Sequence, residues 1–266
     1  MCAAYTPARR DMLAAQFSVD PRDHAIPPHA YPGSMTPIVR RSFDNPSSGQ
    51  REAVSAMFGM VPHWADLKLA RQTYNSRSET TATKPSFRNA WRQRQFCVIP
   101  VASIYEPCYE SGRPVRWQIS HRDGAHLGIA GIWERRTAPG GVGELLSFSM
   151  LTVNADDDPL MQRFHKPNDE KRSVVFLHPD QYDAWLDASV EQAPDFLRLF
   201  PAGELLGIPA PRAPVTQAER KDGEQDDRRD DKRDGRQHQK QDRKQDRKQD
   251  EAPAQGNMFA EPPASH

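Results

Sequence analysis

The chain has 266 residues, and its 36 Lys and Arg residues balance its 36 Asp and Glu residues, so net charge gives no general sign of nucleic-acid binding. No apolar run approaches the ~20 residues that a membrane helix needs, and no secretory signal pattern opens the sequence. We therefore expect a soluble, cytoplasmic protein without a membrane partner. The 3 cysteines include no C-x-x-C pair, which indicates neither a disulfide framework nor a structural zinc site, and we expect no metal and no cofactor.

The pattern of apolar residues predicts a β-rich domain. In chain order, a short helix is expected within residues 7–17 and an extended, proline-rich loop over 18–37. Because the expected strands are separated by turns or short helices rather than regular crossovers, the pattern favours an α+β fold with a mostly antiparallel β core and peripheral helices. The strands are expected at 37–41, 53–61, 95–101, 115–120, 126–133, 144–153 and 173–178, and further helices at 86–94, 157–164, 180–187 and around 196–200.

The last fifth of the chain differs sharply in composition. Residues 219–251 contain 12 Lys and Arg, 12 Asp and Glu and no apolar residue, so burial cannot offset the entropy of ordering them. The sequence therefore predicts one catalytic domain over residues 1–212 and a disordered, charged tail over 213–266.

Cys2 is the most informative position near the start. Removal of the initiator Met, which a small second residue normally permits, would leave a cysteine with a free α-amine beside its thiol. The amine, with an ordinary pKa of about 7.7–8.0, can attack an aldehyde, and the thiol can then close a five-membered thiazolidine ring. Taken alone, a cysteine at position 2 is usually incidental, since free Cys is most often a small buried hydrophobic residue.

Several separated segments resemble one family in the same order. The start, MCAAY, is similar to Met-Cys-Gly-Arg-Phe/Tyr, and residues 58–64 (FGMVPHW) are similar to Trp-Gly-Leu-Ile-Pro-x-Trp. Residues 75–80 (NSRSET) resemble Asn-Ala-Arg-Ser-Glu-Thr, and 96–100 (FCVIP) and 105–107 (YEP) resemble Arg-Cys-Leu-Ile-Pro and Tyr-Glu-Trp. His165, followed by Arg172 and an apolar strand, matches the last segment. The chain thus resembles the SOS-response-associated peptidase (SRAP) family of abasic-site processing proteins.

The resemblance implies a barrel-like SRAP fold and an enzyme that captures abasic sites in single-stranded DNA. Cys2 would form a covalent thiazolidine crosslink with the sugar aldehyde, by lyase-type chemistry that follows autoprocessing of Met1. Such a protein would act in the DNA damage response, and we expect it at the nucleoid.

The family roles extend to three further residues. Asn75 would hold the N-terminus and the crosslink in position, since its amide both donates and accepts. Glu106 would transfer protons near the amine and the sugar, and His165 would be a second acid or base. Taken alone, these residues would be a turn residue, a surface charge and a helix cap. The sequence departs from the family at Ala3 and Ala4, at Pro107, at Ser173 and Val174, and in the inserted residues 166–171.

Candidate DNA contacts lie near these motifs. Arg77 is within the signature, and Pro62 and Trp64 stand where the family places a wedge beside the abasic site, although core packing is an equal alternative for Trp64. Arg88 is a further candidate. The interleaving of Arg88, Arg92 and Arg94 with Phe87 and Trp91 suits phosphate pairing and base stacking, or else a solvated helix face.

Two other functions fit part of the pattern. Cys2 and His165 are the minimum for a cysteine hydrolase or peptidase. A non-catalytic single-stranded DNA-binding protein, with an inert Cys2, is the third reading.

A last motif lies in the tail. Residues 255–259 (QGNMF) are similar to the bacterial sliding-clamp-binding pentapeptide, whose apolar end would fill a partner's pocket. From Gln255 to Phe259 the chain would then tether the domain to the replication clamp, or else be a tail end without a role.

Overall fold

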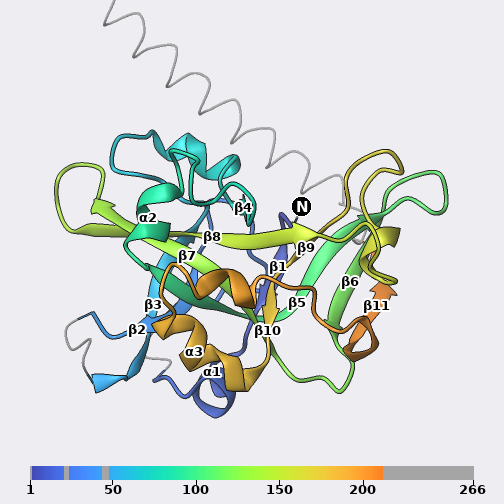
Figure 1. The fold of residues 1–266 in the computed structure, drawn as a ribbon, viewed down its shortest axis with the longest axis horizontal. Helices are drawn as coiled ribbons and strands as arrows, with labels where there is room; N and C mark the ends of the chain where they lie inside the picture. Colours follow the sequence, from blue (N-terminus) through green and yellow to red (C-terminus); the bar gives the residue numbers. More distant parts are fainter. Residues whose placement is uncertain (1, 21–23, 44–47, 212–266) are drawn as a thin grey trace, which may run out of the picture. The chain divides into compact units, whose positions relative to one another are not determined.

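The computed structural model describes residues 2–20, 24–43 and 48–211. Within this part of the chain the strands form one sheet (Figure 1). They are β1 (Tyr5–Pro7), β2 (Met35–Arg41), β3 (Arg51–Phe58), β4 (Asn75–Arg77), β5 (Phe96–Cys108), β6 (Val115–His121), β7 (Leu127–Thr137), β8 (Glu144–Asn154), β9 (Arg172–Val174), β10 (Phe176–Leu177) and β11 (Leu205–Pro209).

The helices are few and short. The expected helices appear as α1 (Arg10–Phe17), α2 (Arg88–Arg92) and α3 (Tyr182–Asp187). Two predictions were wrong. The helix expected over 157–164 is reduced to one 3-10 turn, and residues 197–200 are not helical although Phe200 is buried. The 3-10 turns are η2 (Leu67–Arg71), η3 (Met161–Arg163), η4 (Pro179–Gln181), η5 (Ala193–Phe196) and η6 (Ala202–Glu204).

The sheet closes into a barrel. The order β7-β8-β3-β2-β5 is completed by pairing of β5 with β7, from Phe96 opposite Ile132 to Val101 opposite Leu127. Most neighbours are antiparallel; β3 and β4 run parallel to β8. The expectation of an α+β fold with a mostly antiparallel, barrel-like core is confirmed.

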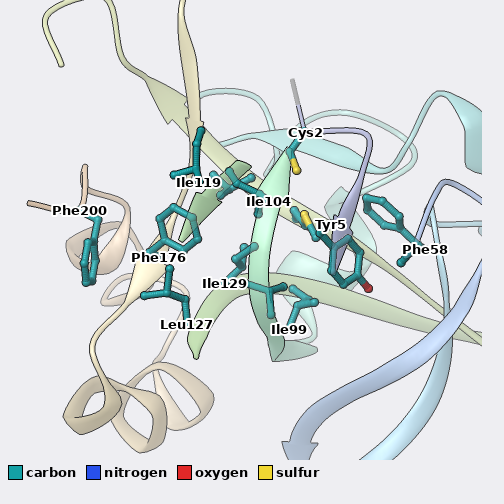
Figure 2. Packing of buried hydrophobic residues seen from close by; sticks show 14 of the residues in the cluster. Cys2, Tyr5, Phe58, Ile99, Ile104, Ile119, Leu127, Ile129, Phe176 and Phe200 are labelled. Atoms are coloured by element: carbon teal, nitrogen blue, oxygen red, sulfur yellow. The ribbon is translucent and has the colours of Figure 1, made fainter. Parts of the chain in front are cut away.

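Two apolar clusters stabilise this arrangement. The first, which we call the site-side cluster, is the set that holds Cys2, Tyr5, Ile104, Phe58 and Phe148. Figure 2 shows Cys2 at one end of it, with its sulfur near Ile104 and Tyr5 beside Phe58. The second, the helix-side cluster, packs α1 and α3 against the barrel.

The helix-side cluster is built on large aromatic rings. Trp185 is fully buried on α3, stacks on Phe96 at 4.5 Å between ring centroids, and donates its indole N–H to the carbonyl of Cys97 at 2.9 Å. Phe17 of α1 stacks on Tyr182 at 5.3 Å. The helix-side cluster therefore fixes α1 and α3 against the barrel through aromatic packing. Among the described residues, no helix is long and apolar enough to span a bilayer.

Candidate active site

The N-terminal segment is held along β5. β1 pairs antiparallel with β5, Tyr5 opposite Ile104, and the carbonyl of Ala4 accepts the Tyr105 N–H at 2.9 Å. This pairing continues the chain toward Cys2, whose side chain is 1% exposed. The Cys2 thiol donates to the Ala4 carbonyl at 3.4 Å. Cys2 thus sits inside the fold, beside the C-terminal part of β5, near Tyr105 and Glu106.

Burial raises the pKa of the Cys2 thiol well above its ordinary value, and repulsion by the Glu106 carboxylate raises that pKa further. The second cause requires the carboxylate to lie close to the sulfur. Glu106 is itself buried, on the strand that carries the N-terminal segment. The thiol therefore stays protonated in this environment.

Asn75 reaches Cys2 from the other side. β4 pairs with β8, Asn75 opposite Met150, which points its buried amide at the N-terminus. The Asn75 Nδ2 donates to the Cys2 carbonyl at 2.8 Å. Within the described chain its Oδ1 is buried without a hydrogen-bond partner. Asn75 therefore holds the Cys2 carbonyl and keeps a buried acceptor in reserve beside the N-terminal segment.

His165 completes the group. Its Nε2 lies 3.1 Å from the Glu106 Oε2, and both side chains are at least nine-tenths buried. The His165 N–H donates to the Pro107 carbonyl at 2.9 Å, which ties the residue to the end of β5. Its backbone is left-handed, with φ of 64°. An imidazole paired with a carboxylate is a proton-transfer unit next to the thiol.

Tyr74 is a site residue that the sequence did not single out. Its phenol is half-buried, and its pKa is raised by burial and then by Glu106 and Cys2, so it lies near both. It also packs edge-on against Phe58 at 5.8 Å. The only sequence signal is its position directly before Asn75.

The signature glutamate has a structural role. Glu79 accepts two hydrogen bonds from Arg172, each of 2.9 Å, and this pairing lowers the pKa of Glu79. Arg172 is 3% exposed and also donates to the Thr152 carbonyl at 2.7 Å. The pair joins the segment after β4 to β9, so it braces the strand that presents Asn75.

The segment that carries Trp64 turns away from the core. Trp64 is 55% exposed, which excludes core packing for it. The turn begins at Gly59, with φ of 108° and the Ala70 carbonyl where a side chain would be, so only glycine fits there. Pro62 is buried, and its carbonyl accepts Arg136 Nη1 at 3.2 Å. Trp64 is therefore presented to solvent by a fixed turn.

The candidate arginines lie in two regions: Arg77 is near the Cys2 group, whereas Arg88 and Arg94 are on or after α2. Arg77 lies on β4 with Asn75, is half-exposed and pairs through Nη1 with Glu170 at 2.7 Å. Arg88 is exposed on α2, which Figure 1 shows apart from the N-terminus. Arg94 donates to the carbonyls of Ala188 and Asp187, so its role is structural.

The expectation of base stacking on Phe87 and Trp91 was wrong. Phe87 is 8% and Trp91 4% exposed, and both belong to the helix-side cluster. They form the inward face of α2, since residues four apart share one side of a helix. Arg88 and Arg92 lie on its solvated face.

A family model described as SOS response associated peptidase (SRAP) matches residues 1–209. The chain belongs to the SRAP family. The match covers all but the last two described residues and includes Cys2, Asn75, Glu106 and His165. The family assignment inferred from the motifs is confirmed.

Individual relatives agree with it. The abasic site processing protein YobE of Bacillus subtilis (strain 168) is 28% identical over 144 residues, which is 53% of this chain and 61% of the relative. The chain therefore covers less than two thirds of that relative's length.

Solved structures show the same fold. A Bordetella bronchiseptica protein is 35% identical with a TM-score of 0.72, over 79% of this chain and 100% of the other. A Bacteroides thetaiotaomicron protein is 20% identical with a TM-score of 0.65, over 77% of this chain and 90% of the other. The barrel is thus shared by proteins whose sequences have diverged widely.

Proposed function

We propose that this SRAP protein captures abasic sites in single-stranded DNA as a thiazolidine crosslink on processed Cys2. One observation carries the proposal: three segments far apart in the sequence bring an amide, a carboxylate and an imidazole together around Cys2. The name of the Bacillus subtilis relative supports the same substrate class.

The chemistry requires no cofactor. The α-amine of Cys2 adds to the aldehyde carbon of the ring-opened sugar, forming a C–N bond, and the carbonyl oxygen takes up a proton. Loss of that oxygen as water gives an imine. The sulfur then adds to the same carbon, and the thiol proton passes to the nitrogen. One water leaves in total, and ring closure is fast because the thiol and imine share one residue.

Each neighbour has a step in this sequence. The Asn75 amide fixes the Cys2 carbonyl, and its Oδ1 accepts from the α-amine. The pair of Glu106 and His165 supplies the proton that removes water and accepts the proton of the adding thiol. Trp64 stacks on a base next to the abasic sugar, and Arg77 exchanges Glu170 for a DNA phosphate.

The hydrolase reading is less compatible with the site. A cysteine hydrolase needs a thiolate, which a paired imidazole stabilises by lowering the thiol pKa. Here burial and Glu106 raise the pKa of Cys2, and the His165 ring is paired with Glu106. In the crosslinking reaction the thiol and the imine carbon are joined within one residue, so the Glu106–His165 pair can accept the thiol proton as the sulfur adds, and no stable thiolate is required beforehand.

The test uses single-stranded DNA with an abasic site made by excising uracil. Protein whose mass shows loss of Met1 should give a heat-stable, slower band on a denaturing gel. Cys2→Ala should abolish the band, whereas Cys108→Ala should retain it. Cys2→Ser keeps the amine but has no sulfur, so its adduct should require borohydride reduction to survive. If processed wild-type protein gave no such band, the proposal would be overturned. If that protein still bound single-stranded DNA, the result would support a non-catalytic DNA-binding protein instead.

The tail remains a separate proposal. Residues 255–259 lie outside the described residues, as do the rest of 212–266. We infer from their sequence alone that they bind the replication sliding clamp and keep the domain at the nucleoid. Deleting residues 252–266 should abolish clamp binding in a pull-down with purified clamp; unchanged binding would contradict this.

A further inference from the structure

The loop that carries His165 is unusual. We call residues 164–171 the His165 loop; six residues separate His165 from Arg172. His165 has a left-handed backbone, which non-glycine residues rarely adopt without support from their surroundings. Its N–H bond to Pro107 fixes only one side of the residue. Something must also hold the peptide groups that follow.

Lys171 does this with its ammonium group. Nζ donates to the carbonyls of Phe164 at 2.9 Å, His165 at 3.4 Å and Lys166 at 2.8 Å. An ammonium has three donors and no acceptor, so all three protons are directed at consecutive carbonyls of one turn. The carbonyls on both sides of the His165 Cα are therefore bound to one cation.

Lys171 is itself anchored by its backbone. Its N–H donates to Asp156 Oδ1 at 2.7 Å, and its carbonyl accepts the Ala155 N–H at 2.8 Å. The next residue, Arg172, is buried in its ion pair with Glu79. The ammonium thus connects the His165 loop to the fixed segments that follow β8 and begin β9. A loop of this length otherwise has many accessible conformations.

We propose that Lys171 is a positioning residue for the crosslinking reaction: it holds the left-handed turn at His165, and thereby keeps the imidazole on Glu106 beside Cys2. Lys171 acts through His165 and does not contact the sugar. This inference rests on the proposed function for its effect on rate, but the geometry it asserts is measurable without DNA.

The kinetic test compares two lysines of the same loop. Lys171→Met removes the clamp while keeping the aliphatic chain, and Lys166→Met removes an equal charge from an exposed side chain. With DNA saturating, Lys171→Met should slow crosslinking about 10- to 100-fold, as loss of a supporting contact does elsewhere. Its DNA affinity should be unchanged, and Lys166→Met should stay within about twofold of wild type.

A double-mutant cycle separates positioning from other roles. If Lys171 acts through the imidazole, adding Lys171→Met to His165→Ala should slow the reaction no further. A full additional effect would show that Lys171 contacts DNA or the fold instead, and would overturn the proposal. Lys171→Gln, which offers two donors, should lie between wild type and Lys171→Met and provides a second variant if Lys171→Met does not fold.

An independent readout does not depend on crosslinking. In protein with 15N-labelled histidine, the His165 imidazole N–H shared with Glu106 should give a protected NMR signal. Lys171→Met should lose this signal while Lys166→Met retains it, with both variants folded. A retained signal in Lys171→Met would overturn the positioning role even if the wild type crosslinks. Loss of the signal, in a protein that does not crosslink, would leave the clamp established and refute only the proposed function.

Discussion

The helix-side cluster and the surroundings of Cys2 are stabilised in opposite ways. In the helix-side cluster, Trp185 is fully buried, its one polar atom is hydrogen-bonded, and its neighbours are aromatic rings. At the Cys2 end, a thiol, an amide, a carboxylate and an imidazole are buried together, with Asn75 Oδ1 unpaired within the described chain. Burial stabilises the first region, whereas in the second it holds polar groups ready at a cost in stability.

The two regions therefore differ in their expected roles. The helix-side cluster should determine whether the protein folds, and the Cys2 end should determine what the folded protein does. Changes in the first should therefore alter the free energy of unfolding without altering the chemistry per folded molecule. Changes in the second should do the reverse.

Glu106→Gln should have the largest effect on chemistry. Losing this proton-transfer group should slow crosslinking about 10²- to 10⁴-fold with little change in melting temperature. Because Glu106 adds to the raised pKa of the Cys2 thiol, the same change should lower that pKa and speed alkylation by iodoacetamide. Glu110→Gln, an exposed carboxylate that pairs with Arg163, is the matched control. If Glu106→Gln changed the crosslinking rate and the alkylation rate in the same direction, the role assigned to Glu106 would be contradicted.

Trp185→Ala should have the largest effect on stability. It removes a fully buried ring and its hydrogen bond to Cys97, so the free energy of unfolding should fall by about 3–5 kcal/mol. Urea titration measures this. At a temperature where the variant is folded, its crosslinking rate should equal the wild type's; a large loss of rate there would show that the two regions are coupled.

Trp64→Ala should affect DNA binding and little else. An exposed side chain contributes within about 0.5 kcal/mol to stability, whereas one stacked base contributes about 1–3 kcal/mol to binding. Affinity for single-stranded DNA should therefore fall about 5- to 150-fold in a fluorescence anisotropy titration. Leu67→Ala, which alters another exposed apolar residue nearby, should bind like wild type. Equal affinities of the two variants would argue against stacking by Trp64.

The smallest effect concerns alkaline pH. Burial raises the pKa of Cys97 far above its ordinary 9.0. Above pH 9 the unfolded chain loses this proton and the folded chain keeps it, so stability falls as pH rises, by about 1.4 kcal/mol per pH unit for one such group. Cys97→Ala should make the decline between pH 9 and 10 shallower by about 1 kcal/mol, because the unfolded thiol is only half ionised at pH 9. Urea midpoints that fall equally in both proteins would exclude this contribution.

The sequence predicted the long strands well, because their apolar residues reflect burial in the barrel. It missed β1, β4 and β11, which are short and are defined by their partners rather than by a pattern of their own. The helix over 157–164 was wrong because that segment instead turns toward β5, where Phe164 bridges Cys108.

Motifs indicated the four candidate residues that the structure brings together, but not the contacts that hold them. The pair of Glu79 and Arg172 joins residues 93 apart, and nothing local in the sequence connects them. In the sequence, Lys171 is only one of several charged residues in an inserted segment. The error at Phe87 and Trp91 has a related origin. The arginines around these two rings suggested a nucleic-acid surface, whereas the structure buries both rings in the helix-side cluster.

The most direct test of the central claim is the covalent structure of the adduct. Trypsin should release residues 2–9 from protein crosslinked to abasic DNA, after nuclease digestion of the strand. The account predicts that this peptide carries the sugar fragment with the loss of one water, takes up no iodoacetamide at Cys2 and gains no hydrogen from borohydride, as a closed thiazolidine requires. A peptide that is reduced by borohydride, retains a free α-amine or is unmodified at Cys2 would contradict it.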